Sequence, residues 1–139
     1  MKALSTLAAA LLLSACATTH PIQPKLASPA VDFAQANTVE VRLSSFRFTP
    51  ETITLEAGKP VALHIVDTAS GGHDFTAPEF FAAAQIARED AATVTEGQVE
   101  LHGGQSATVH LVPAAGTYKL TCTHFGHDAL GMSGTIIVK

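Results

Sequence analysis

Three side chains near the C-terminal end of the sequence have the types and the spacing that a transition-metal site needs. The stretch "CTHFGHDALGM" holds a thiol at Cys122, an imidazole at His127 and a thioether at Met132. Sulfur ligands suit Cu(I), and imidazole binds copper in both of its common oxidation states. Two histidines and one cysteine in a plane, with a distant axial methionine, form a blue-copper electron-transfer site. The stretch therefore predicts a mononuclear copper site that still needs a second imidazole.

That second imidazole has to come from a distant part of the chain. His73, in "SGGHDF", follows a predicted strand, and the two glycines before it permit a sharp turn of the backbone. We therefore assign His73 as the remote ligand and keep His102, which lies beside another glycine pair, as its rival. His124 lies only two residues after Cys122, and its role stays open.

A scaffold of short strands is predicted to hold these residues in place. From Thr38 onward, segments such as "TVEVRLS" alternate apolar and polar residues, which puts Val39, Val41 and Leu43 on one face. Turn residues interrupt such segments every ~8–12 residues, a spacing typical of a β-sandwich. We expect one all-β domain over residues 38–139, built from seven to eight strands.

One Ala-rich stretch, "TAPEFFAAAQIAREDAA", breaks the pattern of alternation. It predicts a short helical flap whose first turn carries a capping box from Thr76 to Glu79. Phe80 and Phe81 are expected to pack in the core at one end of the sandwich rather than to bind a ligand.

The N-terminus predicts export from the cytoplasm. An apolar run from Leu7 to Leu13 follows Lys2, and it is much shorter than the ~20 residues that span a bilayer. Residues 1–15 are therefore expected to be a signal peptide. The ending "LSAC" resembles the bacterial lipobox, which implies cleavage before Cys16 and attachment of lipid to that cysteine. An ordinary secretory signal, which would leave Cys16 free or in a disulfide, is the alternative.

Residues 16–37 are expected to form a lipidated, flexible tether, because they are rich in proline and small residues and show no sustained period. Cleavage would leave 7 basic and 12 acidic residues, since Lys2 is lost. The residue after Cys16 is Ala17, which by the same resemblance favours the outer membrane of a two-membrane bacterium. More than one acyl chain on the cysteine would make the attachment stable.

The composition excludes several classes of function. The formal net charge is −4 and the sequence has no block of basic residues, so nothing indicates nucleic-acid binding. The loop has a single cysteine, which rules out a dinuclear copper centre with two thiolates. No oxyanion-hole donor stands out beside Cys122, and His127 lies on the same loop, so a Cys-His hydrolase is a poor fit. We expect no enzymatic activity.

The stretch from Thr38 to Lys139 resembles the cupredoxins, the family of blue-copper proteins. Its "CTHFGHDALGMSG" has the Cys-x4-His spacing of the azurin loop and the His-x4-Met spacing of the rusticyanin and auracyanin loops. The resemblance implies a Greek-key β-sandwich with a short helical flap that carries one electron at a time. It also implies three planar ligands and one axial ligand, namely His73, Cys122, His127 and Met132.

The resemblance further implies residues that surround the ligands. The family usually has asparagine after the first histidine, whereas this sequence has Asp74. The backbone N–H of Asp74 would bond the Cys122 sulfur. The Asp74 carboxylate could accept a hydrogen bond from Thr123 and lower the reduction potential of the copper. Electrons in the family usually leave through the loop histidine. The rim of the expected docking surface around it consists of Phe125, Ala129 and Leu130.

These features together predict a monomeric, membrane-tethered one-electron carrier with one copper ion, held by lipid on the periplasmic side of the outer membrane. The expected partners are redox proteins of the cell envelope, such as a c-type cytochrome, a copper oxidase or a reductase. Copper storage, delivery or resistance is the alternative function, because the same ligands bind copper tightly. The sequence lacks the Met- and His-rich tracts typical of copper-trafficking proteins, which favours the carrier.

Overall fold

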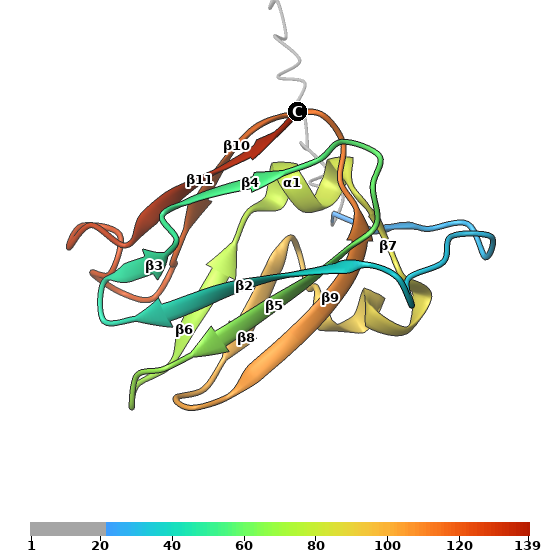
Figure 1. The fold of residues 1–139 in the computed structure, drawn as a ribbon. Helices are drawn as coiled ribbons and strands as arrows, with labels where there is room; N and C mark the ends of the chain where they lie inside the picture. Colours follow the sequence, from blue (N-terminus) through green and yellow to red (C-terminus); the bar gives the residue numbers. More distant parts are fainter. Residues whose placement is uncertain (1–21) are drawn as a thin grey trace, which may run out of the picture.

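Two β-sheets packed face to face make up the structure, a computed structural model that describes residues 22–139 (Figure 1). The six-stranded sheet contains, in spatial order, β1 (Lys25–Leu26), β7 (Gln85–Ile86), β9 (Ser106–Val112), β5 (Val61–Asp67), β2 (Asn37–Ser44) and β3 (Arg47–Thr49). The five-stranded sheet contains β4 (Thr52–Leu55), β11 (Ser133–Val138), β10 (Gly116–Thr121), β6 (His73–Thr76) and β8 (Gln98–Leu101). This arrangement confirms the predicted all-β sandwich.

Alternation of apolar residues fixes which face of each long strand points inward. In β2, Val41 and Leu43 are buried while Glu40 and Arg42 are exposed. Each buried aliphatic side chain of this size stabilises the fold by about 1.5–3 kcal/mol. The structure has more strands than the seven to eight expected, because β1, β3 and β7 have only two or three residues each.

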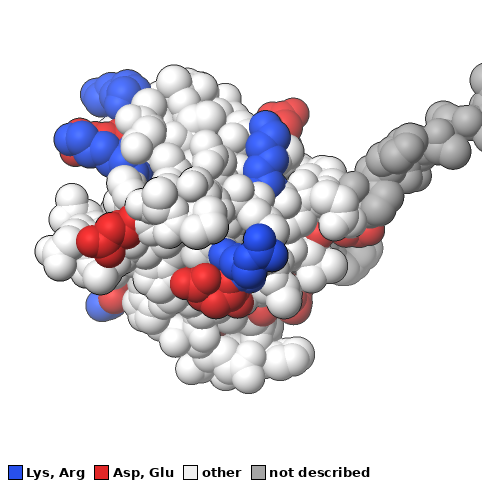
Figure 2. All heavy atoms as spheres, turned by 90° about the vertical axis from the view of Figure 1, so that its right-hand side faces the viewer, with Lys and Arg blue, Asp and Glu red and all other residues white. Residues whose placement is uncertain are grey.

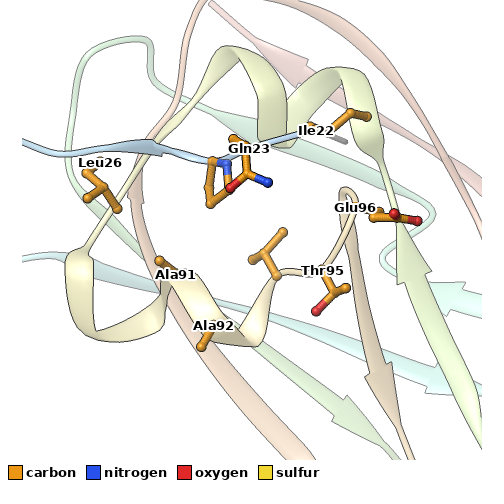
Figure 3. A pocket seen from close by; sticks show the side chains of 9 residues that line it. Ile22, Gln23, Leu26, Ala91, Ala92, Thr95 and Glu96 are labelled. Atoms are coloured by element: carbon orange, nitrogen blue, oxygen red, sulfur yellow. The ribbon is translucent and has the colours of Figure 1, made fainter. Parts of the chain in front are cut away.

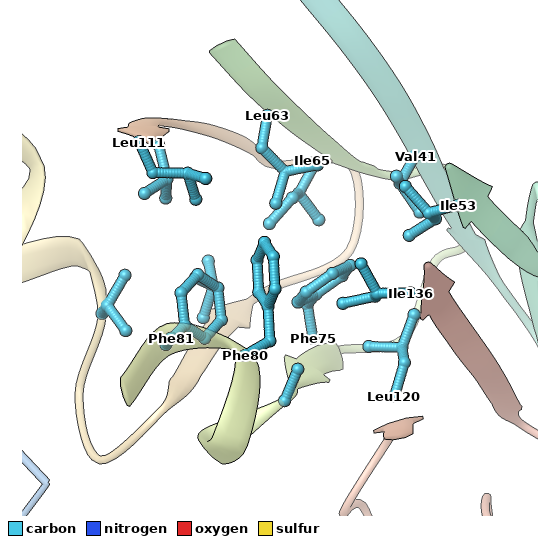
Figure 4. Close-up of a cluster of buried hydrophobic side chains, with 14 of the residues drawn as sticks. Val41, Ile53, Leu63, Ile65, Phe75, Phe80, Phe81, Leu111, Leu120 and Ile136 are labelled. Carbon is cyan, nitrogen blue, oxygen red and sulfur yellow. The ribbon is translucent and has the colours of Figure 1, made fainter. Parts of the chain in front are cut away.

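Aromatic side chains fill the core between the sheets. Phe75 from β6 lies beside Phe81, with their ring centroids 5.9 Å apart. Phe80 and Phe81 come from the helix α1 (Pro78–Ala83) and point into the same cluster (Figure 4). The prediction that these two residues pack in the core is confirmed.

The start of α1 differs from the sequence prediction. Ala77 is the N-cap residue, and no side chain within the described part of the chain caps it. Thr76 instead donates from Oγ1 to the Asp74 carboxylate at 2.6 Å. The predicted capping box between Thr76 and Glu79 is therefore wrong, because Thr76 is the last residue of β6 and bonds within that strand. A 3-10 helix, η1 (Arg88–Thr93), follows β7.

The N-terminal segment packs along the domain from residue 22 onward. Strand β1 pairs in parallel with β7, and the Ala27 N–H donates to the Ile86 carbonyl at 2.8 Å. Phe33 lies edge-on to His110, with ring centroids 5.9 Å apart. Much of the segment that the sequence predicted as a flexible tether is thus held against the sandwich by backbone pairing.

The predicted signal peptide (residues 1–15), the lipidated Cys16 and the first part of the tether lie outside the described residues. Between residues 22 and 139, no helix has the length and apolar character needed to cross a bilayer.

The described N-terminal segment and the loop that joins β10 to β11 lie at opposite ends of the sandwich (Figure 1). The face at the N-terminal end carries lysines, arginines, aspartates and glutamates interspersed, without a patch of one sign (Figure 2).

Candidate metal centre

Hydrogen-bonded turns hold the three predicted ligands of the C-terminal loop together. Strands β10 and β11 pair up to Thr121 and Ser133, so residues 122–132 close a loop at the sheet end. The Cys122 N–H donates to the Met132 carbonyl at 3.2 Å, and the Met132 N–H donates to the His127 carbonyl at 3.0 Å. The backbone thereby links all three residues before any metal is bound.

Cys122 and His127 are placed to share an ion. The Cys122 Sγ lies 3.5 Å from Nδ1 of His127. Metal bonds of ~2.3 Å to sulfur and ~2.0 Å to nitrogen would separate two such donors by roughly 3.5 Å. Cys122 and Met132 are fully buried and His127 is half-buried, and Cys122 forms no disulfide within residues 22–139.

His73 lies beside these residues at the start of β6. Its ring centroid is 5.0 Å from that of His127, and its side chain is buried. Its Nδ1 is 3.2 Å from both carboxylate oxygens of Asp67, whereas Nε2 is buried with no hydrogen-bond partner among the described residues. Buried polar atoms without a partner are rare and indicate a missing water or ion. A thiol, two imidazoles and a thioether are a donor set whose chemistry fits a copper ion, and the fold brings the rings of His73 and His127 together beside Cys122.

The rival histidines are placed differently. His102 is exposed in the β8–β9 turn, where its backbone N–H donates to Gln105. His124 faces Glu100, with Nε2 2.8 Å from the Glu100 Oε1. The structure thus brings His73, not His102, to the imidazole of His127.

A separate group of possible ligands lies next to this site. Within residues 22–139, this group consists of Asp74, Glu100 and His124, whose donor atoms all lie within 4.8 Å of one another. His73, Cys122 and His127 are not such a group, because their donor atoms do not all lie within 4.8 Å of one another. The Asp74 oxygens already accept hydrogen bonds from Thr76 and Thr123, so the Asp74–Glu100–His124 group is accounted for without a metal.

Asp74 ties β6 to the ligand loop. Its oxygens accept from the Thr123 N–H at 3.0 and 2.9 Å and from the Thr123 hydroxyl at 2.7 Å. Asp74 is fully buried and Thr123 is exposed, so these bonds are partly shielded from water. The hydrogen bond expected between Asp74 and Thr123 is present, and it fixes the position of the residue that follows Cys122.

Burial and neighbouring groups adjust the acidity of two ligands. The pKa of the Cys122 thiol is raised, and burial is the main cause. The Asp74 and Glu100 carboxylates also raise this pKa. Hydrogen bonds from the backbone N–H groups of Asp74 and His124 act in the opposite direction and lower it. Burial, followed by the nearby His73 and His124 rings, lowers the pKa of His127. The free thiol therefore keeps its proton until a metal displaces it, while the His127 imidazole is neutral near pH 7.

The rim around His127 is apolar. Phe125 is fully exposed and Leu130 is 61% exposed, and Ala129 is exposed beside them. Sequence reasoning missed Phe46, in the β2–β3 turn, whose ring lies edge-on to His127 with centroids 5.1 Å apart. Phe46 has a φ of 66°, in the left-handed region, and no local sequence pattern indicates that conformation.

Asp67 and Glu100 are two further residues that sequence reasoning missed. Each contacts a histidine near the site, Asp67 contacting His73 and Glu100 contacting His124. These contacts form only when β5, β6, β8 and the ligand loop come together, so the signal lies in the tertiary structure.

A hollow of about 530 Å³ lies away from these residues, between the N-terminal segment and η1 (Figure 3). Its lining includes Ile22, Leu26, Ala91 and Thr95. It contains none of the predicted ligands.

Comparisons with known proteins agree with this architecture. The sequence model of the cupredoxin-like domain family matches residues 4–138. The chain belongs to the cupredoxin-like domain family. No curated protein sequence matches it.

Three solved structures resemble the fold. Auracyanin B is 25% identical, with a TM-score of 0.57, over 84% of this chain and 99% of that one. Auracyanin A is 20% identical, with a TM-score of 0.52, over 73% of this chain and 98% of that one. It is described as a "blue" copper protein from the green thermophilic photosynthetic bacterium Chloroflexus aurantiacus. The McoA multicopper oxidase of the hyperthermophile Aquifex aeolicus is 13% identical, with a TM-score of 0.61, over 78% of this chain and 30% of that one.

Proposed function

We propose that the protein binds one copper ion and carries single electrons between redox proteins. The proposed ligands are His73, Cys122, His127 and Met132. The observation that carries the proposal is the 3.5 Å separation of the Cys122 Sγ and the His127 Nδ1, next to the buried ring of His73. The description of auracyanin A as a blue copper protein supports this assignment.

The residues of the site hold the ligands in a nearly fixed arrangement. Copper, when bound, supplies a centre that gains or loses one electron. Cu(II) and Cu(I) prefer different geometries, so a site whose ligands move little favours rapid exchange. The Asp74–Thr123 bonds and the Cys122–Met132 backbone bond restrain the loop from both sides. Burial of Cys122 and Met132 keeps water away from the sulfur ligands.

His127 provides the proposed exit for the electron. It is half-buried; the exposed Phe46 ring lies edge-on to it, and the exposed Phe125 and Leu130 lie within three residues of it in the chain. A rim of this size suits a small, short-lived contact, as weak redox encounters bury less than ~1,200 Å². Proposed partners are envelope redox proteins such as a c-type cytochrome, a copper oxidase or a reductase.

We propose that the domain is a monomer held by lipid on Cys16 on the periplasmic side of the outer membrane. The lipobox-like "LSAC" supports the attachment. The opposite placement of the N-terminal segment and the ligand loop is compatible with a carrier that is held at one end and reacts at the other (Figure 1).

The proposed function does not include catalysis. The multicopper oxidase resembles this chain over only 30% of its own length, so its activity is not carried over. None of the proposed ligands lines the hollow between the N-terminal segment and η1.

The direct test is to add Cu(II) to the purified protein, record the visible spectrum and then titrate the protein electrochemically. An intense blue absorption with a reversible one-electron wave is the expected result. Tight binding without reversible cycling would instead favour storage or delivery. A colourless protein that does not bind copper would overturn the proposal.

A further inference from the structure

Phe46 occupies a backbone conformation that its residue type disfavours. The last residue pair between β2 and β3 joins Ser44 to Arg47, so residues 45 and 46 form the whole connection between the two strands. Connections of two residues usually place glycine or asparagine where φ is positive, because a Cβ atom crowds the backbone there. Phe46 has a φ of 66°. A bulky residue held in this region costs stability, and such outliers concentrate at functional sites.

Core packing does not account for Phe46. Its side chain is 39% exposed and lies outside the buried cluster, whereas Phe48 is 1% exposed and belongs to that cluster. Within residues 22–139, the aromatic neighbour of Phe46 is His127. The two ring centroids are 5.1 Å apart and the ring planes meet at 81°, an edge-on arrangement that is favourable for aromatic rings. The strained turn therefore places a ring against the imidazole of the ligand loop.

The imidazole of His127 lacks the kind of partner that orients most of the other histidines. In the described part of the chain, four histidines have a side-chain oxygen within hydrogen-bonding distance of a ring nitrogen: His64 (Thr108), His73 (Asp67), His110 (Asp90) and His124 (Glu100). The Nδ1 of His127 instead has the Cys122 sulfur at 3.5 Å. Hydrogen bonds fix the backbone N–H and carbonyl of His127, but they leave rotation of its side chain free. Packing against neighbouring rings must therefore orient this imidazole.

From this geometry we propose that Phe46 is a positioning residue for the metal centre: its ring holds the His127 imidazole with Nδ1 toward the Cys122 sulfur. The inference rests on the proposed copper site. The rings of His73 and His124 also lie beside His127, but they come from the five-stranded sheet and from the ligand loop itself.

Phe46 reaches His127 from the six-stranded sheet, because the turn that carries it joins β2 to β3. Its contact therefore restrains the imidazole relative to a part of the fold that does not move with the ligand loop. A side chain that is already ordered loses less conformational freedom when a ligand binds, so this restraint favours tighter metal binding.

The first test uses the metal-free protein and NMR. Cross-relaxation between the ring protons of Phe46 and His127 should show that the two rings are in contact, and three-bond couplings should show one side-chain rotamer of His127. In the variant Phe46→Leu, His127 should exchange among rotamers. A single rotamer of His127 in both proteins would overturn the proposal.

The second test separates the ring from the backbone turn. Phe46→Tyr keeps the ring, Phe46→Leu removes it and keeps the strained backbone, and Phe46→Gly removes the ring and relieves the strain. Phe46→Gly should therefore unfold at a higher denaturant concentration than Phe46→Leu. We expect Cu(II) binding to be about 3- to 10-fold weaker in both of these variants and unchanged in Phe46→Tyr. Copper affinity that follows stability, with Phe46→Gly equal to the unsubstituted protein, would show that Phe46 is a turn residue only and would overturn the inference.

Phe33→Leu is the matched control, because Phe33 lies edge-on to a different histidine, His110, with ring centroids 5.9 Å apart. This variant should bind Cu(II) as tightly as the unsubstituted protein. Equal weakening of Cu(II) binding by Phe33→Leu and Phe46→Leu would contradict a specific role of Phe46.

The proposed function and this inference fail in distinguishable ways. If the unsubstituted protein binds no copper, the proposed function is overturned, and with it the role of Phe46 toward a metal. If the unsubstituted protein binds copper reversibly and the leucine and glycine variants of Phe46 bind it equally tightly, the copper site stands and only the role of Phe46 is lost.

Discussion

Asp74 and Thr123 are joined by three hydrogen bonds although 49 residues separate them in the chain. Asp74 is the second residue of β6 in the five-stranded sheet, and Thr123 is the second residue of the ligand loop. The pair thus couples the strand that carries His73 to the segment that carries Cys122 and His127.

Replacement of Asp74 by alanine should destabilise the protein by about 1–3 kcal/mol, because the Thr123 and Thr76 donors would lose their acceptor. Denaturant unfolding of the metal-free protein measures this effect. Asp74→Asn keeps an acceptor and should cost less, while it should raise the reduction potential because the charge is removed. Equal stability of Asp74→Ala and the unsubstituted protein would show that these bonds do not restrain the loop.

Cys122→Ser should abolish the intense blue absorption, because the thiolate dominates the electronic structure of the copper. The sandwich should remain folded, since serine is close to cysteine in size. Visible absorption and far-ultraviolet circular dichroism check the two statements. A variant that stays blue would contradict the ligand assignment.

The metal-free protein should lose stability as the pH rises above about 8.5, the usual thiol pKa of an unfolded chain. Burial raises the pKa of Cys122 in the folded protein, so the unfolded chain releases its thiol proton first as the pH rises. The contribution of the Cys122 thiol to the stability of the fold is therefore fully present below the thiol pKa of the unfolded chain. It is lost as the pH rises through the higher thiol pKa of the folded protein. Denaturant unfolding at pH 8 and pH 10 measures the slope of the unfolding free energy against pH. Cys122→Ser should remove this part of the slope, and an identical slope in both proteins would argue against a raised thiol pKa.

Phe125→Ser should slow electron exchange with a c-type cytochrome without changing the reduction potential or the stability. The Phe125 side chain is fully exposed, so it contributes contact area to a partner and little to the fold. Stopped-flow kinetics measures the exchange. Leu26→Ser is the control, because Leu26 is also exposed but lies at the N-terminal end. Equal slowing of electron exchange by both variants would show that the cytochrome does not dock on the rim around His127.

Cys16→Ser should release the protein from membranes in cells, because lipid attachment requires the thiol. Fractionation of membranes and soluble extract measures this outcome. The released protein should retain its copper spectrum, since the described ligands all lie beyond residue 70. Unchanged membrane retention of the variant would contradict the lipid anchor.

Local patterns in the sequence predicted the long strands well, because side-chain alternation depends on near neighbours. Val41 and Leu43 show this directly, as each is buried on the expected face of β2. The spacing of a thiol, an imidazole and a thioether predicts a metal site in the β10–β11 loop, and backbone hydrogen bonds link these three residues there. Strands of two or three residues, such as β1 and β7, carry no such period and form only through distant pairing.

The partners of polar side chains were the part that local patterns of residue type could not supply. Asp67 lies six residues before His73, and only the turn after β5 brings its carboxylate back to the imidazole. Thr76 has the residue type of a helix cap, yet the acceptor within its own strand, Asp74, takes its hydroxyl. In both cases the path of the folded backbone decided which partner the side chain met, and the residue type alone left that partner open.

The position of the described N-terminal segment, at the end remote from His127, has a practical consequence (Figure 1). If the chain is attached to a surface upstream of Ile22, the apolar rim around His127 faces away from that surface. A redox partner can then reach the rim without displacing the attachment. Immobilisation on a gold surface through an added N-terminal thiol should therefore orient the molecules alike, with their reactive imidazoles toward the solution.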